Sequence, residues 1–193
     1  MVFDWKNNKQ EALANGIKKV DTFGKTQVIM TSVNGAIEGH TFRNFPDLEF
    51  EDGTLVTGCT FEDCGTISIN ECNLHHCTFK RLEFIFSVRS KIVNSKFCEL
   101  VCDDDMLICL EDSELKHCTF DDIELRNESY LCDGVGDSWI EAGRFSNIRT
   151  SRADKEIANC EETVGKIFKK KKKFCIIEED SCTGLDSIQV LAG

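Results

Sequence analysis

The stretch GCTFEDC occupies residues 58–64, and two similar stretches follow it, HCTFKRL at residues 76–82 and HCTFDDI at residues 117–123. A small residue usually stands two positions before the phenylalanine, an aliphatic residue five positions before it, and an apolar or small residue three positions after it. Six phenylalanines have such surroundings: Phe42, Phe61, Phe79, Phe97, Phe120 and Phe145. Self-similarity of this kind indicates a repeat protein.

The spacing of the phenylalanines identifies the kind of repeat. Successive members are 19, 18, 18, 23 and 25 residues apart. This period is too long for a helical turn or a heptad, and it suits one coil of a parallel β-solenoid, which needs several short strands and corners. We therefore predict that the six rings stack along the interior. Beside them the small Cys and Ser residues would form a narrower buried column.

A second apolar strip follows the motif in most coils, with the i, i+2 spacing of a strand that buries one face. It contains Leu48 and Phe50, Ile67 and Ile69, Phe84 and Phe86, and Leu107 and Cys109. We predict that these side chains point into the solenoid.

The units CNLHHCTFKRLEF (residues 72–84) and SELKHCTFDDIEL (residues 113–125) resemble the small-x-Leu/Phe-x-x repeat of the pentapeptide-repeat family. The resemblance covers roughly residues 35–150. It implies a right-handed quadrilateral β-helix with four such units per coil, from which the unequal coil lengths depart. The alternative is a more general right-handed parallel β-helix, an architecture that also houses carbohydrate-active enzymes. Either way, the predicted fold class is all-β.

The ends of the chain differ from the repeats. Residues 6–20 predict a short polar helix within an N-terminal cap over residues 1–25, and TQVIM (residues 26–30) would be the first strand. The β-helix of about six coils would cover residues 26–150. Residues 151–193 would form a C-terminal cap or tail of uncertain structure, with KFCIIEED as a closing strand. An uncovered terminal coil would permit a homodimer.

The net charge of the chain limits the classes of partner that it can bind. The net charge is −11, which disfavours direct binding to nucleic acid or anionic membranes and favours a basic protein partner. The apolar runs are too short for a membrane span, and the N-terminus lacks the apolar stretch of a signal peptide, so we predict a cytoplasmic protein. In the family that the repeats resemble, some members imitate DNA, and the charge here agrees with such mimicry. The run Lys169–Lys173 is interpreted as a solvated charge run.

The chain has twelve cysteines, and most fall on repeat positions that other coils fill with Ser, Leu or Ile. We interpret them as reduced, buried small hydrophobes. Cys98 and Cys102 are the expected exposed exceptions. The crowded Cys72, His75, His76 and Cys77 invite a zinc proposal, but repeat alignment buries both thiols. No metal or other cofactor is therefore predicted.

An acidic cluster is the best candidate site. The segment from Val101 to Tyr130 contains ten acidic and two basic residues, and an insertion lengthens this coil. DGVGDSW (residues 133–139) would be a second insertion and a turn. We predict a binding or scaffolding protein whose rigid acidic surface meets a basic protein. The alternative is a small carbohydrate-active or metal-assisted enzyme that uses these carboxylates. The candidate binding residues are Asp103, Asp104, Asp105, Glu111, Asp112, Asp121 and Asp122.

Overall fold

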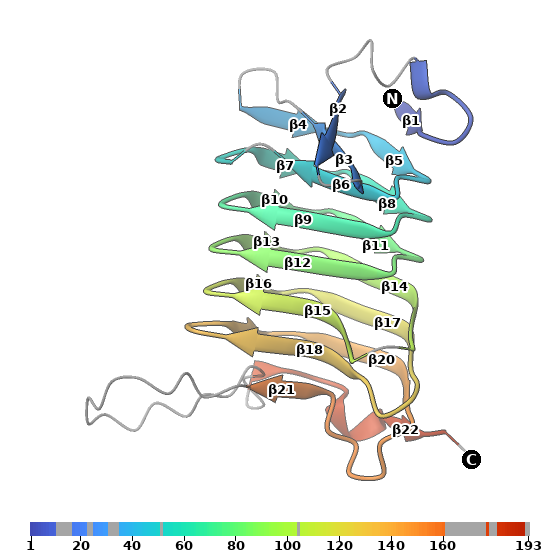
Figure 1. The fold of residues 1–193 in the computed structure, drawn as a ribbon. Coiled ribbons are helices and arrows are strands. Elements are labelled where there is room, and N and C mark those ends of the chain that lie inside the picture. Colours follow the sequence, from blue (N-terminus) through green and yellow to red (C-terminus); the bar gives the residue numbers. More distant parts are fainter. Residues whose placement is uncertain are drawn as a thin grey trace.

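The computed structural model describes residues 1–10, 17–22, 25–30, 35–50, 52–103, 105–160, 177 and 181–191. These residues wind into a right-handed parallel β-helix, with the two chain ends at opposite ends of the stack (Figure 1). The predicted fold class is thereby confirmed. Among the described residues, none belongs to a helix long and apolar enough to cross a membrane.

The coils build three sheets, in which all neighbouring strands are parallel except β2 and β3. Sheet A contains β1 (Val2–Asp4), β5 (Thr41–Arg43), β8 (Thr60–Glu62), β11 (Thr78–Lys80), β14 (Lys96–Cys102), β17 (Thr119–Leu125), β20 (Arg144–Thr150) and β22 (Gln189–Val190). Sheet B contains β2 (Ile17–Thr22), β3 (Lys25–Met30), β6 (Asp47–Phe50), β9 (Thr66–Asn70), β12 (Phe84–Val88), β15 (Met106–Glu111), β18 (Tyr130–Val135) and β21 (Ala158–Cys160). Sheet C contains β4 (Ala36–Glu38), β7 (Leu55–Thr57), β10 (Asn73–His75), β13 (Lys91–Val93), β16 (Glu114–Lys116) and β19 (Trp139–Glu141). Coil 1 is formed by β4, β5 and β6, and coils 2 to 6 continue in the same order.

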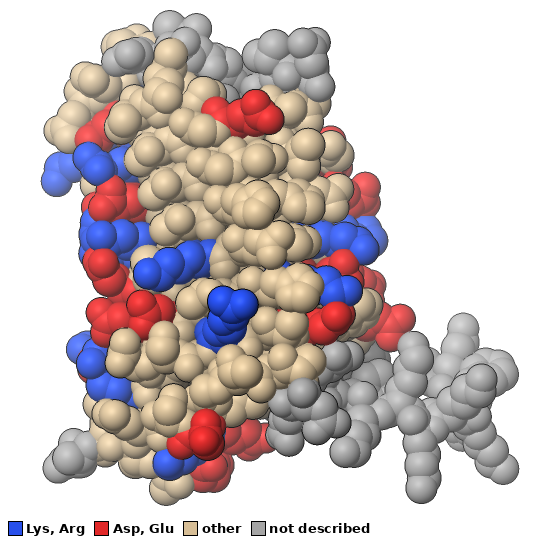
Figure 2. All heavy atoms as spheres, turned by 180° about the vertical axis from the view of Figure 1, so that it is seen from behind, with Lys and Arg blue, Asp and Glu red and all other residues tan. Residues whose placement is uncertain are grey.

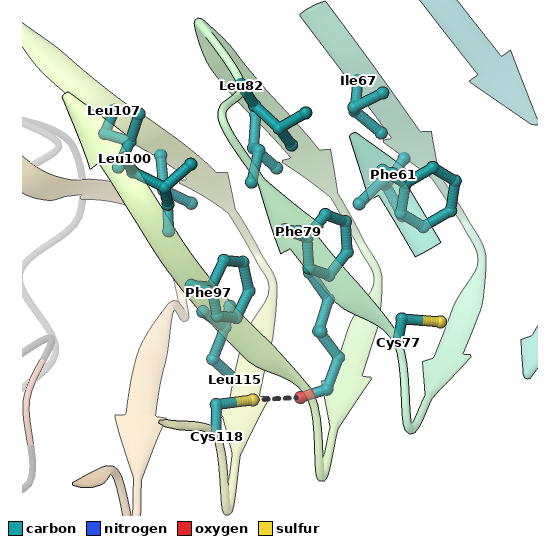
Figure 3. Packing of buried hydrophobic residues seen from close by; sticks show 14 of the residues in the cluster. Phe61, Ile67, Cys77, Phe79, Leu82, Phe97, Leu100, Leu107, Leu115 and Cys118 are labelled. Atoms are coloured by element: carbon teal, nitrogen blue, oxygen red, sulfur yellow. Dashed lines mark hydrogen bonds between the residues drawn. The ribbon is translucent and has the colours of Figure 1, made fainter. Parts of the chain in front are cut away.

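The six phenylalanines form one stack inside the solenoid, as predicted. Successive ring centroids lie 4.7 to 5.4 Å apart, with interplanar angles of 7 to 23°. Figure 3 shows Phe61, Phe79 and Phe97 in this stack. Phe3 of β1 extends it beyond coil 1, with its ring 5.5 Å from that of Phe42. All seven rings are buried, so the stack is the continuous part of the core.

Three corners turn each coil, and their residues adopt positive φ. The first corner, between sheets B and C, carries Gly53, Glu71, Arg89 and Asp112. The second, between sheets C and A, carries Gly39, Gly58, His76, Asn94, His117 and Ala142. The third, two residues after each phenylalanine, carries Asn44, Asp63, Arg81, Glu99, Asp122 and Asn147. Left-handed backbone costs a non-glycine residue roughly 1–2 kcal/mol. Backbone hydrogen bonds to the adjacent coil hold the corners, as where His76 N–H donates to the Val93 carbonyl at 3.0 Å.

The corners also explain why coil length varies. From Glu71 to His76 and from His76 to Arg81 the chain advances by five residues, the unit length that the resemblance implies. The third side runs eight residues, from Arg81 to Arg89. Coils of 18 residues therefore have three sides instead of four equal ones. Coil 4 adds its extra residues to the third side, which begins at Glu99 and ends at the next first corner, Asp112.

Small Ser and Cys residues next to the corners complete the backbone hydrogen bonding there. The Ser95 and Ser90 hydroxyls accept from the backbone N–H groups of Cys77 and Cys72, each at 3.0 Å. The Cys118 thiol donates to a backbone carbonyl of the preceding coil at 3.4 Å (Figure 3).

The two ends of the chain partly correct the sequence analysis. The predicted helical cap over residues 6–20 is not supported, because residues 17–20 belong to β2, which pairs antiparallel with β3. Residues 11–16 lie outside the described residues. A strand is present at TQVIM as β3, but β1 and β2 precede it, so it is not the first strand.

Near the C-terminus the described residues continue the sheets as an irregular seventh coil. Ile177 bridges to Ile140, Thr183 bridges to Arg144, and β22 pairs with β20. The 3-10 helix η2 (Leu185–Ser187) lies between the last two of these segments. The run Lys169–Lys173 and most of KFCIIEED lie outside the described residues.

Two interpretations of sheet B were wrong. Phe84 and Phe86 do not point inward, because β12 aligns Ile85 with Ile67 and Ser87 with Ile69. A shift of one residue in register exchanges the two faces of a strand, and Cys109 faces outward for the same reason. In DGVGDSW the predicted turn is confined to residues 136–138, where Gly136 has a positive φ, because Asp133–Val135 continue β18. Most of the extra residues of coil 5 instead form the bend at residues 126–129.

Candidate interaction surface

Four of the seven predicted site residues lie at the two ends of one strand, β15. Asp103 and Asp105 belong to the loop that precedes it, Glu111 is its last residue, and Asp112 is the first corner directly after it. All four are exposed. We call these four residues the acidic rim. Asp104 lies outside the described residues.

The loop before β15 is held by the loop of the next coil. Asn127 Nδ2 donates to the Asp103 carbonyl at 3.1 Å, and the Tyr130 N–H donates to the Asp105 carbonyl at 2.9 Å. The Asp103 carboxylate lies 3.4 Å from Arg126 Nη1, an exposed pair that neutralises part of the local charge. The insertions of coils 4 and 5 therefore stack on each other as the strands do.

The other half of the rim has less positive charge near it. Asp112 Oδ1 accepts a hydrogen bond from the Asp137 N–H at 2.9 Å. Among the described residues no Lys or Arg forms an ion pair with Asp105, Glu111 or Asp112. Arg89, on the neighbouring first corner, instead pairs with Glu71 at 2.6 Å. A surplus of negative charge therefore remains at this corner.

Asp121 and Asp122 lie elsewhere, on sheet A and at the third corner. Ser146 and Asn147 donate to the Asp121 carboxylate at 2.8 and 2.9 Å, and Lys96 lies 3.5 Å from it. Hydrogen bonds from Ser146 and Asn147, together with Lys96, lower the pKa of Asp121. Asp122 pairs with Arg149 at 3.3 Å. The structure does not bring these two residues to the acidic rim.

The third corner is neutralised because charge alternates from coil to coil. Arg81 contacts Glu62 and Asp63 of the preceding coil and Glu99 of the following coil, the last at 2.7 Å. Viewed from the side opposite to Figure 1, charged side chains gather toward the two lateral edges of the molecule (Figure 2). The sequence analysis missed this column of alternating charges, because the residues that pair in it are 18 or 19 positions apart in the sequence. Comparing the two residues after each phenylalanine across all six coils would have revealed these pairs.

Seven described carboxyl groups lack the raised pKa of a general acid. A glycosidase general acid needs a raised pKa. Hydrogen bonds and neighbouring cations instead lower the pKa of seven described carboxyls: Asp4, Glu62, Asp63, Glu99, Asp121, Glu124 and Asp154. These groups are thus held ionised, which suits ion pairing.

Ten cysteines of the described residues are free thiols, and burial dominates their chemistry. Desolvation raises the pKa of Cys77 to about 12 and that of Cys118 to about 11. Cys98 and Cys102, expected to be exposed, are buried. Cys102 aligns with the inward Leu125, and Cys98 stands between Lys80 and Asp121 in the register of sheet A. The half-buried cysteines are Cys109 and Cys182.

A shallow groove of about 630 Å³ lies on coils 1 to 3, where the third sides carry no insertion. Trp5, Pro46, Gly65, Arg81 and Glu83 are among its lining residues. A Cβ on Gly65 would lie 2.2 Å from the Pro46 carbonyl oxygen, so this close approach needs glycine. None of the acidic rim lines this groove.

Comparisons with known proteins add little to this geometry. No protein-family model matches the chain, and no curated protein matches it. Among solved structures the chain is similar to a trypsin-treated form of QnrB1, a plasmid-mediated fluoroquinolone resistance protein. The two share 16% sequence identity over 68% of this chain and 77% of that one, with a TM-score of 0.23. The fold assignment rests on the strand pairing of this chain itself.

Proposed function

We propose that the protein is a binding or scaffolding protein whose rigid solenoid presents an acidic surface to a basic protein partner. The observation that carries this proposal is the acidic rim at both ends of β15, where Asp105, Glu111 and Asp112 have no basic ion-pair partner among the described residues. Glu111 is part of β15, and backbone hydrogen bonds to the next coil hold Asp105 and Asp112, so these residues are ordered before binding. Such pre-ordering lowers the entropy lost on docking.

The test compares two sets of carboxylates on the same molecule. The rim variant D103N/D105N/E111Q/D112N should bind a polybasic peptide about tenfold more weakly than the wild type at low salt, because each neutralised carboxylate removes a screened attraction. The control D121N/D122N also removes acidic residues, but on sheet A and at the third corner, where each carboxylate already has a basic partner, and it should bind nearly as the wild type does. Equal weakening in both variants, or wild-type binding that high salt leaves unchanged, would contradict the proposal.

Several finer features stay predictions. Two of the three sides of each 18-residue coil have the five-residue length of the pentapeptide repeat, which supports a distant relationship to that family. DNA mimicry, a cytoplasmic location and a homodimer through a terminal coil remain expectations from the sequence. The enzyme alternative is not proposed, because the structure separates Asp121 and Asp122 from the acidic rim, so that the predicted carboxylates do not form one site.

A further inference from the structure

The outer face of the middle of sheet B is apolar. Three side chains on each of β12, β15 and β18 lie outward, by register or by the burial pattern of the strand. Glu111 and Asp133 are two of these nine, and none of the nine is Lys or Arg. The other seven are half-buried apolar or aromatic side chains, which we call the apolar face: Phe84, Phe86, Val88, Met106, Cys109, Tyr130 and Val135. Sheet B faces the viewer in Figure 1.

The solenoid itself does not require this composition. On β9, one coil earlier, the register places Thr66 opposite Phe84, Ser68 opposite Phe86 and Asn70 opposite Val88. Coil 2 therefore forms the same strand with polar outward residues. The folding of coil 3 therefore does not explain why these three outward positions carry large apolar side chains.

The composition resembles the centre of a protein interface. Interface centres are enriched in Phe, Tyr and Met and depleted of charge, and soluble proteins seldom show large contiguous apolar patches without a use for them. At the margin of the face the Arg152 guanidinium already stacks on the Tyr130 ring, 4.2 Å from its centroid. One aromatic ring of this face, that of Tyr130, thus already accepts a cation.

The acidic rim borders the apolar face on both sides. Asp103 and Asp105 stand before β15, and Glu111 and Asp112 stand at its end. A complementary partner therefore has an apolar centre flanked by basic side chains. A second copy of this chain fits poorly, because two such faces would bring carboxylates against carboxylates.

We infer that the apolar face receives a protein segment with an apolar side flanked by Lys or Arg, as an amphipathic basic helix presents. The strands β12, β15 and β18 span about 10 Å at a spacing of ~4.8 Å, which matches the ~10 Å diameter of a helix. This inference rests on the proposed function and adds that apolar burial contributes to the affinity beside charge.

The experiment measures binding of two peptides to the full chain. One is a Leu/Lys peptide of about five helical turns, with Leu on one side, and the other replaces each Leu by Ser at the same charge. The wild type should bind the Leu/Lys peptide at least about tenfold more tightly than the Ser/Lys peptide. The variant F84T/F86S/V88N, which copies the outer residues of β9, should lose this preference. The control L55T/V101T removes two apolar side chains exposed elsewhere and should keep it.

Each other outcome overturns the inference in a recognisable way. If both peptides bind equally and salt weakens both, the proposed function stands and the apolar face is not used. If neither peptide binds at low salt, the proposed function fails together with this inference. A doubled mass in sedimentation that F84T/F86S/V88N abolishes would show that a second copy covers the face.

Discussion

Single residues in the phenylalanine stack carry the stability of the interior. Phe79 is buried between Phe61 and Phe97, with ring centroids 5.1 and 4.7 Å away. Phe79→Ala should lower the free energy of unfolding by about 3–5 kcal/mol, because it leaves a cavity in the stack. Phe86→Ala is the matched control, since the same ring faces outward on β12, and it should cost about 1 kcal/mol. Urea unfolding measures both, and equal costs would show that Phe79 is not an interior ring.

Thiol reactivity tests the same interior at other residues. Burial raises the pKa of Cys77 to about 12, so the fraction of thiolate at pH 8 is on the order of a thousandfold lower than for a free cysteine. Labelling of the folded chain, followed by peptide mass spectrometry, should therefore modify Cys109 and Cys182 before Cys77 and Cys118. Modification of Cys77 as fast as that of Cys109 would contradict the assigned burial.

At the scale of the element, the corners are the least predictable part of the fold. The sequence predicted the phenylalanine column and its aliphatic partners, because burial imposes a repeating pattern. It did not predict the positive φ of Glu71 and Arg89, since these residue types have no turn preference and adjacent coils impose the conformation. For the same reason it misassigned Phe84 and Phe86, whose direction depends on register with β9.

The second corner offers a direct test of this conformational constraint. His76 has a φ of 55°, and the same column holds Gly58 in coil 2. His76→Val should destabilise the protein by about 1–3 kcal/mol, because a β-branched residue tolerates positive φ poorly. His76→Gly should be close to neutral, since strain relief and added chain entropy oppose each other. Thermal unfolding measures both variants, and a neutral His76→Val would rule out a constrained corner.

The third corner predicts a pH dependence. Hydrogen bonds from Arg43 and Arg81 lower the pKa of Glu62, and hydrogen bonds from Arg81 lower that of Asp63. Groups with a lowered folded-state pKa stabilise the fold above their unfolded pKa values, roughly 4. This contribution is lost as pH falls through the folded-state values.

Arg81→Gln should therefore destabilise the protein at pH 7, by about 1 kcal/mol for several exposed pairs, and match the wild type more closely near pH 2. Arg144→Gln, which removes an exposed arginine of β20, is the control. A stability difference between Arg81→Gln and the wild type that stays constant with pH would show that the ion pairs of Arg81 do not stabilise the fold.

At the scale of the whole molecule, the winding decides which acidic residues meet. Sequence reasoning placed all seven in one cluster because they are close along the chain. The structure separates Asp121 and Asp122 from the rim, since each coil carries its residues past three corners. The apolar face could not be predicted for a related reason. It combines three strands whose outward residues are 20 or more positions apart and become neighbours only through register.

Side-chain footprinting tests the location of the interaction surface most directly. Hydroxyl radicals would be applied to the full chain with and without the Leu/Lys peptide, and oxidation would be read residue by residue. We predict that the peptide protects Phe86, Met106 and Tyr130 on sheet B and leaves Trp139 and His75 on sheet C unchanged. Protection of Trp139 and His75, with unaltered oxidation of Phe86 and Met106, would contradict the assignment of sheet B as the binding surface.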